Sequence, residues 1–109
     1  MNSGISDRPG NNTVHQPPLT RSIITLSGQC SGPTRPIFEI YRAAVQHGMK
    51  GSVRKSADES LVITIEAVED EKQLFMSWLT NYARATGFSL KCVESEKLMR
   101  FTGFLIAAT

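Results

Sequence analysis

The order in which strand-like and helix-like segments alternate constrains the fold of this chain more than any other feature. SIITLSG, residues 22–28, is apolar and rich in β-branched residues and stops at a glycine, as a strand entering a loop does. PIFEIYRAAVQHG, residues 36–48, has the periodicity of a helix, with Pro36 suited to its first turn and Gly48 to its C-terminal cap. The apolar face of this predicted helix consists of Ile37, Ile40, Tyr41, Ala44 and Val45.

The rest of the chain repeats the same alternation. MKGSVRKS (49–56) and LVITIEAV (61–68) are predicted to form a hairpin, since the second segment alternates strictly between apolar and mixed positions. Asp70 can cap a helix over residues 70–84, and FSLKCVES (88–95) and FTGFLIAA (101–108) are two further candidate strands. The predicted core faces are Leu61, Ile63, Ile65 and Ala67 in the strand, and Leu74, Phe75, Trp78, Leu79 and Tyr82 in the helix.

This order predicts an α+β fold of the ferredoxin-like kind. We expect a βαββαβ sandwich in which two helices cover one face of an antiparallel sheet, with an extra short strand near the C-terminus. Residues 1–20 are rich in Ser, Gly, Asn and Pro without apolar periodicity, which predicts a flexible N-terminal tail. Residues 21–109 are expected to form the domain.

Composition narrows the classes of function. The chain has 109 residues, enough for one core, and its 12 basic and 10 acidic residues give a net charge of only +2. We therefore expect neither a nucleic acid nor a membrane partner, no metal and no cofactor, a monomer, and a cytoplasmic location, since the N-terminal segment lacks the apolar core of a signal peptide. Cys30 and Cys92 match no metal spacing, so free thiols are the default and a disulfide is the alternative.

The loop GQCSGPTRP, residues 28–36, is the candidate for a binding site. A glycine-bearing loop that enters a helix can surround an anion with unpaired backbone N–H groups at the positive end of the helix dipole. Gly32, Pro33, Thr34 and Arg35 are the candidate anion-binding residues, because the Arg35 guanidinium would add a forked pair of donors. The alternative is an ordinary strand-to-helix connection with a surface arginine.

With this loop and this element order, the chain resembles the acylphosphatase family. The family signature, Gly-x-Val-Gln-Gly-Val-Gly-Phe-Arg, aligns with residues 28–36 and keeps the glycines at Gly28 and Gly32. A second segment, Gly-x-x-Gly-Trp-Val-x-Asn followed by an Asp-Gly turn, aligns with residues 48–59, and FTGF, residues 101–104, echoes the family's last strand. The matches in the second segment are Gly48, Gly51, Val53 and Asp58. The resemblance covers residues 21–107 and implies hydrolysis of the carboxyl-phosphate bond of acyl phosphates.

The chain departs from the family pattern at the positions that the resemblance identifies as catalytic. The arginine that holds the phosphate is replaced by Pro36, and the asparagine that positions the attacking water is replaced by Lys55. A protonated lysine has no acceptor with which to orient a water. We therefore expect a pseudoenzyme with little or no hydrolysis, acting as a regulatory or binding module for a small molecule that carries a phosphate or carboxylate.

Two other functions remain open at this point. In the first, the chain is an active acylphosphatase in which Arg35 and Lys55 act as the catalytic residues in an altered geometry. In the second, it is a structural domain that pairs with a partner through a sheet edge.

Overall fold

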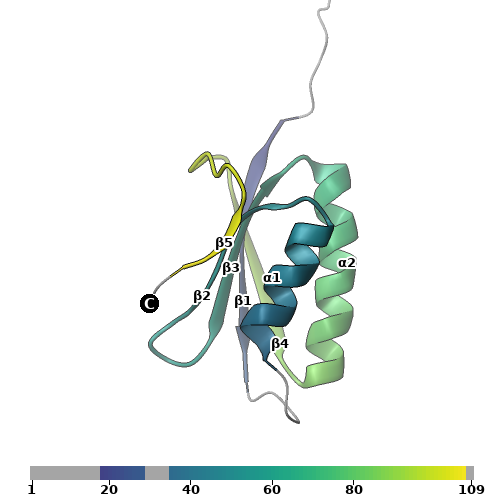
Figure 1. The fold of residues 1–109 in the computed structure, drawn as a ribbon, viewed down its shortest axis with the longest axis vertical. Helices are drawn as coiled ribbons and strands as arrows, with labels where there is room; N and C mark the ends of the chain where they lie inside the picture. Colours follow the sequence, from purple (N-terminus) through teal and green to yellow (C-terminus); the bar gives the residue numbers. More distant parts are fainter. Residues whose placement is uncertain (1–17, 29–34, 108–109) are drawn as a thin grey trace, which may run out of the picture.

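The computed structural model of the chain describes residues 18–28 and 35–107. Within these ranges the elements alternate as the sequence predicts (Figure 1). They are β1 Thr20–Ser27, α1 Pro36–Gln46, β2 Lys50–Lys55, β3 Leu61–Ala67, α2 Glu69–Thr86, β4 Ser89–Ser95 and β5 Phe104–Ile106. The predicted tail, residues 1–20, lies outside the described residues except at its end, where β1 begins at Thr20.

The described strands form one sheet in the order β4-β1-β3-β2-β5, and both helices cover the same face (Figure 1). This confirms the ferredoxin-like α+β fold. The sheet is mixed rather than antiparallel throughout, because β5 pairs in parallel with β2, with Gly51 opposite Phe104. The reason is geometric: after β4 the chain reverses direction and reaches the opposite edge, where β2 also runs opposite to β4.

The core lies between the sheet and the helices. The predicted inner face of β3, from Leu61 to Ala67, is buried as expected. The described helices contribute fully buried side chains at positions four apart, which are Ile40 and Ala44 in α1 and Phe75 and Leu79 in α2. Among the described residues, no helix is long and apolar enough to cross a membrane.

Three details of the predicted helices are wrong. In α2, Leu74 is 68% exposed and Ala83 is buried instead, because a helix on a sheet buries a narrow stripe that here passes through Phe75. In α1, Val45 is 51% exposed for the same reason. Asp70 is not the cap of α2 either: the helix begins at Glu69 and its N-cap residue is Val68.

Glu66 fixes the segment that joins β4 to β5. Its side chain is on the strand face away from the helices, yet the residue is only 6% exposed. The backbone N–H of Phe101 donates to Glu66 Oε1 at 3.0 Å, and those of Met99 and Arg100 donate to Oε2. Burial alone would raise the pKa of Glu66, but these N–H groups, with Arg21 nearby, hold it below its ordinary value. A buried carboxylate thus anchors the chain as it crosses toward β5.

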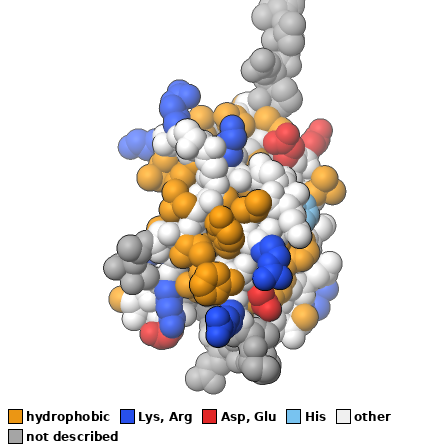
Figure 2. Space-filling model, in the orientation of Figure 1, with side chains coloured by type: hydrophobic (Ala, Val, Ile, Leu, Met, Phe, Trp, Pro, Cys, Tyr) orange, Lys and Arg blue, Asp and Glu red, His pale blue; other side chains and the backbone are white. Residues whose placement is uncertain are grey.

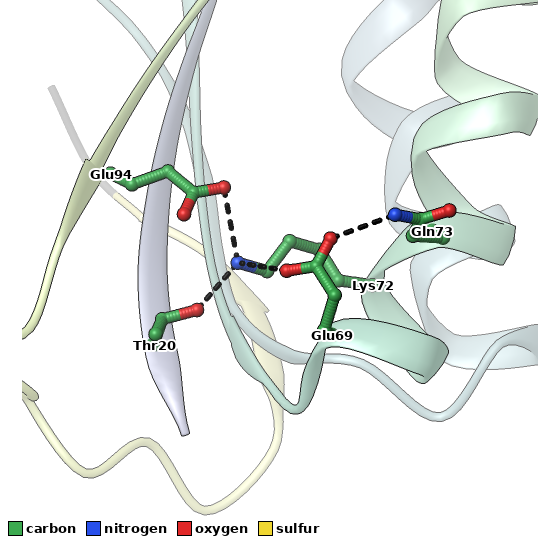
Figure 3. A network of polar contacts seen from close by, with 5 residues as sticks. All are labelled: Thr20, Glu69, Lys72, Gln73 and Glu94. Carbon is green, nitrogen blue, oxygen red and sulfur yellow. Dashed lines mark hydrogen bonds and ion pairs between the residues drawn. The ribbon is translucent and has the colours of Figure 1, made fainter. Parts of the chain in front are cut away.

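Lys72 is a second buried charge, and Figure 3 shows that its ammonium is surrounded by oxygen atoms. Its Nζ lies 3.2 Å from Glu94 Oε2 on β4 and 3.7 Å from Glu69 Oε1, and it donates to the Thr20 hydroxyl on β1. Gln73 in turn donates to Glu69. Because each of these contacts joins α2 to itself or to a strand, we interpret Lys72 as a structural tie between the helix and the sheet.

Candidate functional site

The candidate site is a pocket of about 560 Å³ at one end of the sheet, called here the α1 pocket. It lies where β1 ends, α1 begins, β2 turns into β3 and α2 turns into β4, at the lower end of the molecule in Figure 1. The βαββαβ order brings these four connections together, so residues far apart in sequence share one cavity. The described lining residues are Gly28, Arg35, Pro36, Ile37, Phe38, Lys55, Glu59, Leu61 and Phe88.

The start of α1 forms one side of the pocket. Arg35 is the exposed N-cap residue, and its carbonyl accepts the first helical hydrogen bond from the Glu39 N–H at 3.0 Å. Pro36 occupies the first helical turn and has no N–H to offer a ligand. Within the described residues no side chain caps the helix, so Ile37 and Phe38 keep the unpaired N–H groups typical of a helix start.

Lys55 and Glu59 form the opposite side. Lys55 is the last residue of β2, and its Nζ lies 2.8 Å from Glu59 Oε1, with both side chains substantially exposed. Glu59 has a φ of 72°, a left-handed conformation that glycine adopts more easily than glutamate. The hairpin therefore holds a carboxylate against Lys55 at a position where the backbone favours glycine.

The turn that carries Glu59 is built on Asp58. Asp58 accepts hydrogen bonds from the Ser56 hydroxyl and from the Ser60 N–H, the latter at 3.1 Å. The Ser56 hydroxyl, with the Ser60 N–H, holds the pKa of Asp58 below its ordinary value. These contacts fix the connection from Lys55 to Leu61 and so set one wall of the α1 pocket.

Apolar side chains line the remaining wall. Leu61 is 5% exposed, Phe88 and Ile37 are partly buried against the core, and Phe38 is 54% exposed. Figure 2 shows hydrophobic side chains gathered over α1 and β5, with Lys and Arg around them. The described lining of the pocket therefore combines apolar side chains with exposed charged groups.

Only some of the site residues predicted from the sequence are found in the described lining of the α1 pocket. Arg35 and Lys55 line the same pocket, as do Gly28 and Pro36 from the signature loop. Gly32, Pro33 and Thr34 lie outside the described residues, so their anion-binding role stays a prediction. Sequence reasoning missed Phe88, which reaches the pocket from the turn after α2, and Glu59, whose signal was a charged residue at the glycine position of an Asp-Gly turn.

Two other residues with reactive side chains, Cys92 and His47, are not among the described residues that line the α1 pocket. Cys30 falls outside the described residues. Cys92 is a free thiol on β4 whose pKa is raised by partial burial and by the Glu94 carboxylate, which disfavours the reactive thiolate. His47 caps the C-terminal end of α1, with its Nδ1 2.9 Å from the Ala43 carbonyl. None of the described features of Cys92 or His47 connects either residue to the α1 pocket.

Fold and pocket together define an α+β sandwich with a mixed charged and apolar cavity at the start of its first helix. A sequence profile of the acylphosphatase family matches residues 38–106, which is more than half of the chain. The protein therefore belongs to the acylphosphatase family. The matched range includes Lys55 but begins two residues after Pro36, so the signature loop lies outside it.

Solved structures show the same fold. The chain is similar to acylphosphatase from Bacillus subtilis, with a TM-score of 0.70 and 20% identity over 81% of this chain and 98% of that one. It is similar to an acylphosphatase from Coxiella burnetii, with a TM-score of 0.65 and 16% identity over 83% and 94% of the two chains. It also matches 12% of full-length HypF in a phosphate- and nucleotide-bound form, with a TM-score of 0.70 and 18% identity over 86% of this chain. A comparison with curated proteins gives no match.

Proposed function

We propose that this protein is an acylphosphatase-family domain that binds an anionic small molecule at the α1 pocket and hydrolyses acyl phosphates slowly or not at all. The observation that carries the proposal is the chemistry of the two positions that the family uses. Pro36 and Lys55 both line the pocket. The resemblance aligns them with the family's phosphate-holding arginine and its water-positioning asparagine.

The replacement of asparagine by Lys55 affects water positioning most. An amide offers both a donor and an acceptor, whereas an ammonium offers donors alone and cannot accept a hydrogen bond from the attacking water. Lys55 is moreover paired with Glu59 at 2.8 Å, so its charge is partly compensated before any ligand arrives. Loss of one positioning or oxyanion-stabilising group typically lowers a rate by about 10² to 10³.

The capacity to hold an anion is less affected. Arg35 stands one residue before the family's arginine, at the N-cap of α1, with the unpaired N–H groups of the helix start beside it. Holding a charge requires only that donors and cations face it, which is less demanding than orienting a water for attack. Arg35, Lys55 and the start of α1 meet this requirement from two sides of one cavity.

Inorganic phosphate provides a direct test of this anion site. We expect the amide NMR signals of Ile37 and Phe38 to shift on phosphate addition, because their N–H groups belong to the helix start. Arg35→Gln should weaken phosphate binding by about fivefold or more, because it removes a charge-assisted partner at an exposed site. Arg42→Gln is the matched control, since Arg42 is an exposed arginine of the same helix that does not line the pocket. Shifts scattered over the domain, or equal effects of the two variants, would contradict the anion site.

The sheet-edge function predicted as an alternative has one supporting observation. The edge strand β5 is short and exposes Leu105 and Ile106, at 47% and 40%. If this edge joins two copies of the chain, sedimentation velocity should show a species whose size rises with concentration. A monomer throughout would rule out pairing between copies.

A further inference from the structure

We propose that the natural ligand of the α1 pocket is an amphiphilic anion: an apolar body of at least the size of a phenyl ring that carries a single anionic head group, a phosphate or a carboxylate. The anionic head group rests on the proposed function, and the apolar body of the ligand is the new part of this inference. Small hydrophilic acyl phosphates and free phosphate would then be poor ligands.

The size of the cavity is the first argument. A volume of about 560 Å³ lies within the range of about 300–1,000 Å³ typical of sites for small organic molecules. A bare tetrahedral anion takes roughly the space of two or three waters, at about 30 Å³ each. Most of the pocket would therefore stay filled with water if the ligand were a phosphate alone.

The lining of the cavity is the second argument. Five of the described lining residues are apolar: Pro36, Ile37, Phe38, Leu61 and Phe88. Phe38 is 54% exposed and lies on the first turn of α1, at the edge of the pocket. A ligand that covers Phe38 and Phe88 removes apolar surface from water, which is the main source of affinity in small-molecule sites.

The charges at the rim are the third argument. The described lining residues include the cations Arg35 and Lys55 and the carboxylate of Glu59, so they carry one net positive charge. A single anionic head compensates that charge. Because Glu59 already holds Lys55, the head group has to displace the Glu59 carboxylate or share Lys55 with it. Glu59 thus acts as a competing anion that weakens binding of a head group with no apolar body.

Three probes separate the head from the body. Inorganic phosphate supplies the head, benzyl alcohol supplies the body, and phenyl phosphate supplies both; each is titrated into the full chain and followed by amide NMR. We expect phenyl phosphate to bind at least about tenfold more tightly than either of the others, since burial of a ring adds to the contacts of the head. The amide signals shifted by phenyl phosphate should include those of Arg35, Ile37, Phe38 and residues 55–61.

Variants then assign the preference to residues. Phe38→Ala should reduce the advantage of phenyl phosphate over phosphate by about fivefold, because it removes apolar surface that the ring would cover, and it should fold because the side chain is exposed. Val45→Ala, an exposed aliphatic on the same helix outside the pocket lining, is the matched control and should leave the ratio unchanged. Glu59→Gln should tighten binding of both anions by about threefold or more, because it removes the competing charge.

The outcomes separate this inference from the proposed function. If phosphate and phenyl phosphate bind equally tightly at the pocket, the anion site is supported but the proposal of an amphiphilic ligand is wrong. If benzyl alcohol binds as well as phenyl phosphate, the head group is irrelevant and both proposals fail. If none of the probes shifts the pocket residues, the anion site itself is contradicted. A preference for phenyl phosphate that Phe38→Ala does not reduce would overturn the assignment of the body to this wall.

Discussion

Replacing Gly51 with alanine should destabilise the domain by about 4 kcal/mol or more, a large part of the roughly 5–15 kcal/mol that stabilises an ordinary domain. Gly51 is a buried residue of β2 with a φ of 153°, and its N–H donates to the Gly103 carbonyl at 2.9 Å. A Cβ on Gly51 would meet the backbone oxygen of Thr64 at 1.8 Å and the Cα of Ile65 at 2.9 Å. Neither atom can move without breaking the pairing of β2 with β3, so the clash can be relieved only at the cost of hydrogen bonds in the sheet.

Two other glycines provide matched controls, with urea denaturation as the measurement. Gly48→Ala places a Cβ in open space but keeps a φ of 68°, so it should cost about 1–2 kcal/mol from backbone conformation alone. Gly103→Ala meets nothing within 4 Å and should change stability by less than about 1 kcal/mol. If Gly51→Ala lowers the free energy of unfolding no more than Gly48→Ala does, the close packing of Gly51 against β3 described here is wrong.

Removing the Glu66 carboxylate should have the second largest effect. Glu66→Ala leaves the N–H groups of Met99, Arg100 and Phe101 without their carboxylate acceptor and should cost about 3 kcal/mol. Glu66→Gln keeps an oxygen acceptor but loses the charge, so it should cost less, about 1–2 kcal/mol. Glu96→Gln, an exposed residue of the same connection, is the control and should stay within about 0.5 kcal/mol of the wild type.

The same carboxylate makes part of the stability depend on pH. Because the pKa of Glu66 is lower in the folded chain than its ordinary value of 4.5, the folded state favours the ionised form. This contribution is fully present above pH 4.5 and is lost as the pH falls through the lower, folded-state pKa. Urea denaturation at pH 7 and at about pH 3 should therefore show the difference between wild type and Glu66→Gln shrinking in acid. A difference that stays the same in acid would show that Glu66 is not held ionised by these N–H groups.

The fold was predictable because each element carries its own local pattern. The strict alternation from Leu61 to Ala67 identified the buried face of β3, and Pro36 marked the start of α1 correctly, whereas the C-cap of α1 is His47, one residue before the predicted Gly48. The parallel pairing of β5 was not predictable, since it depends on which edge the chain reaches after β4. The burial of Glu66 was also hidden, because its partners are backbone N–H groups about 35 residues further along the chain.

The site was predictable to a smaller extent. The glycine-bearing loop and the resemblance drew attention to Arg35 and Lys55, which the structure places on one pocket. The ion pair of Lys55 with Glu59 follows from the shape of a turn, and the approach of Phe88 follows from tertiary packing. Neither leaves a periodic signal in the sequence. The apolar character of the pocket was missed for the same reason, since its walls come from α1, β3 and the turn after α2.

The most direct test of the proposed function is the rate at which the chain hydrolyses an acyl phosphate such as benzoyl phosphate. The wild type should turn over far below the roughly 1–10³ s⁻¹ of ordinary enzymes. The double variant Pro36→Arg, Lys55→Asn should gain activity, whereas Pro36→Ala, Lys55→Ala, which removes the same side chains without supplying the family's groups, should not. Turnover by the wild type in the range of ordinary enzymes would contradict the proposal and show that the chain is an active acylphosphatase.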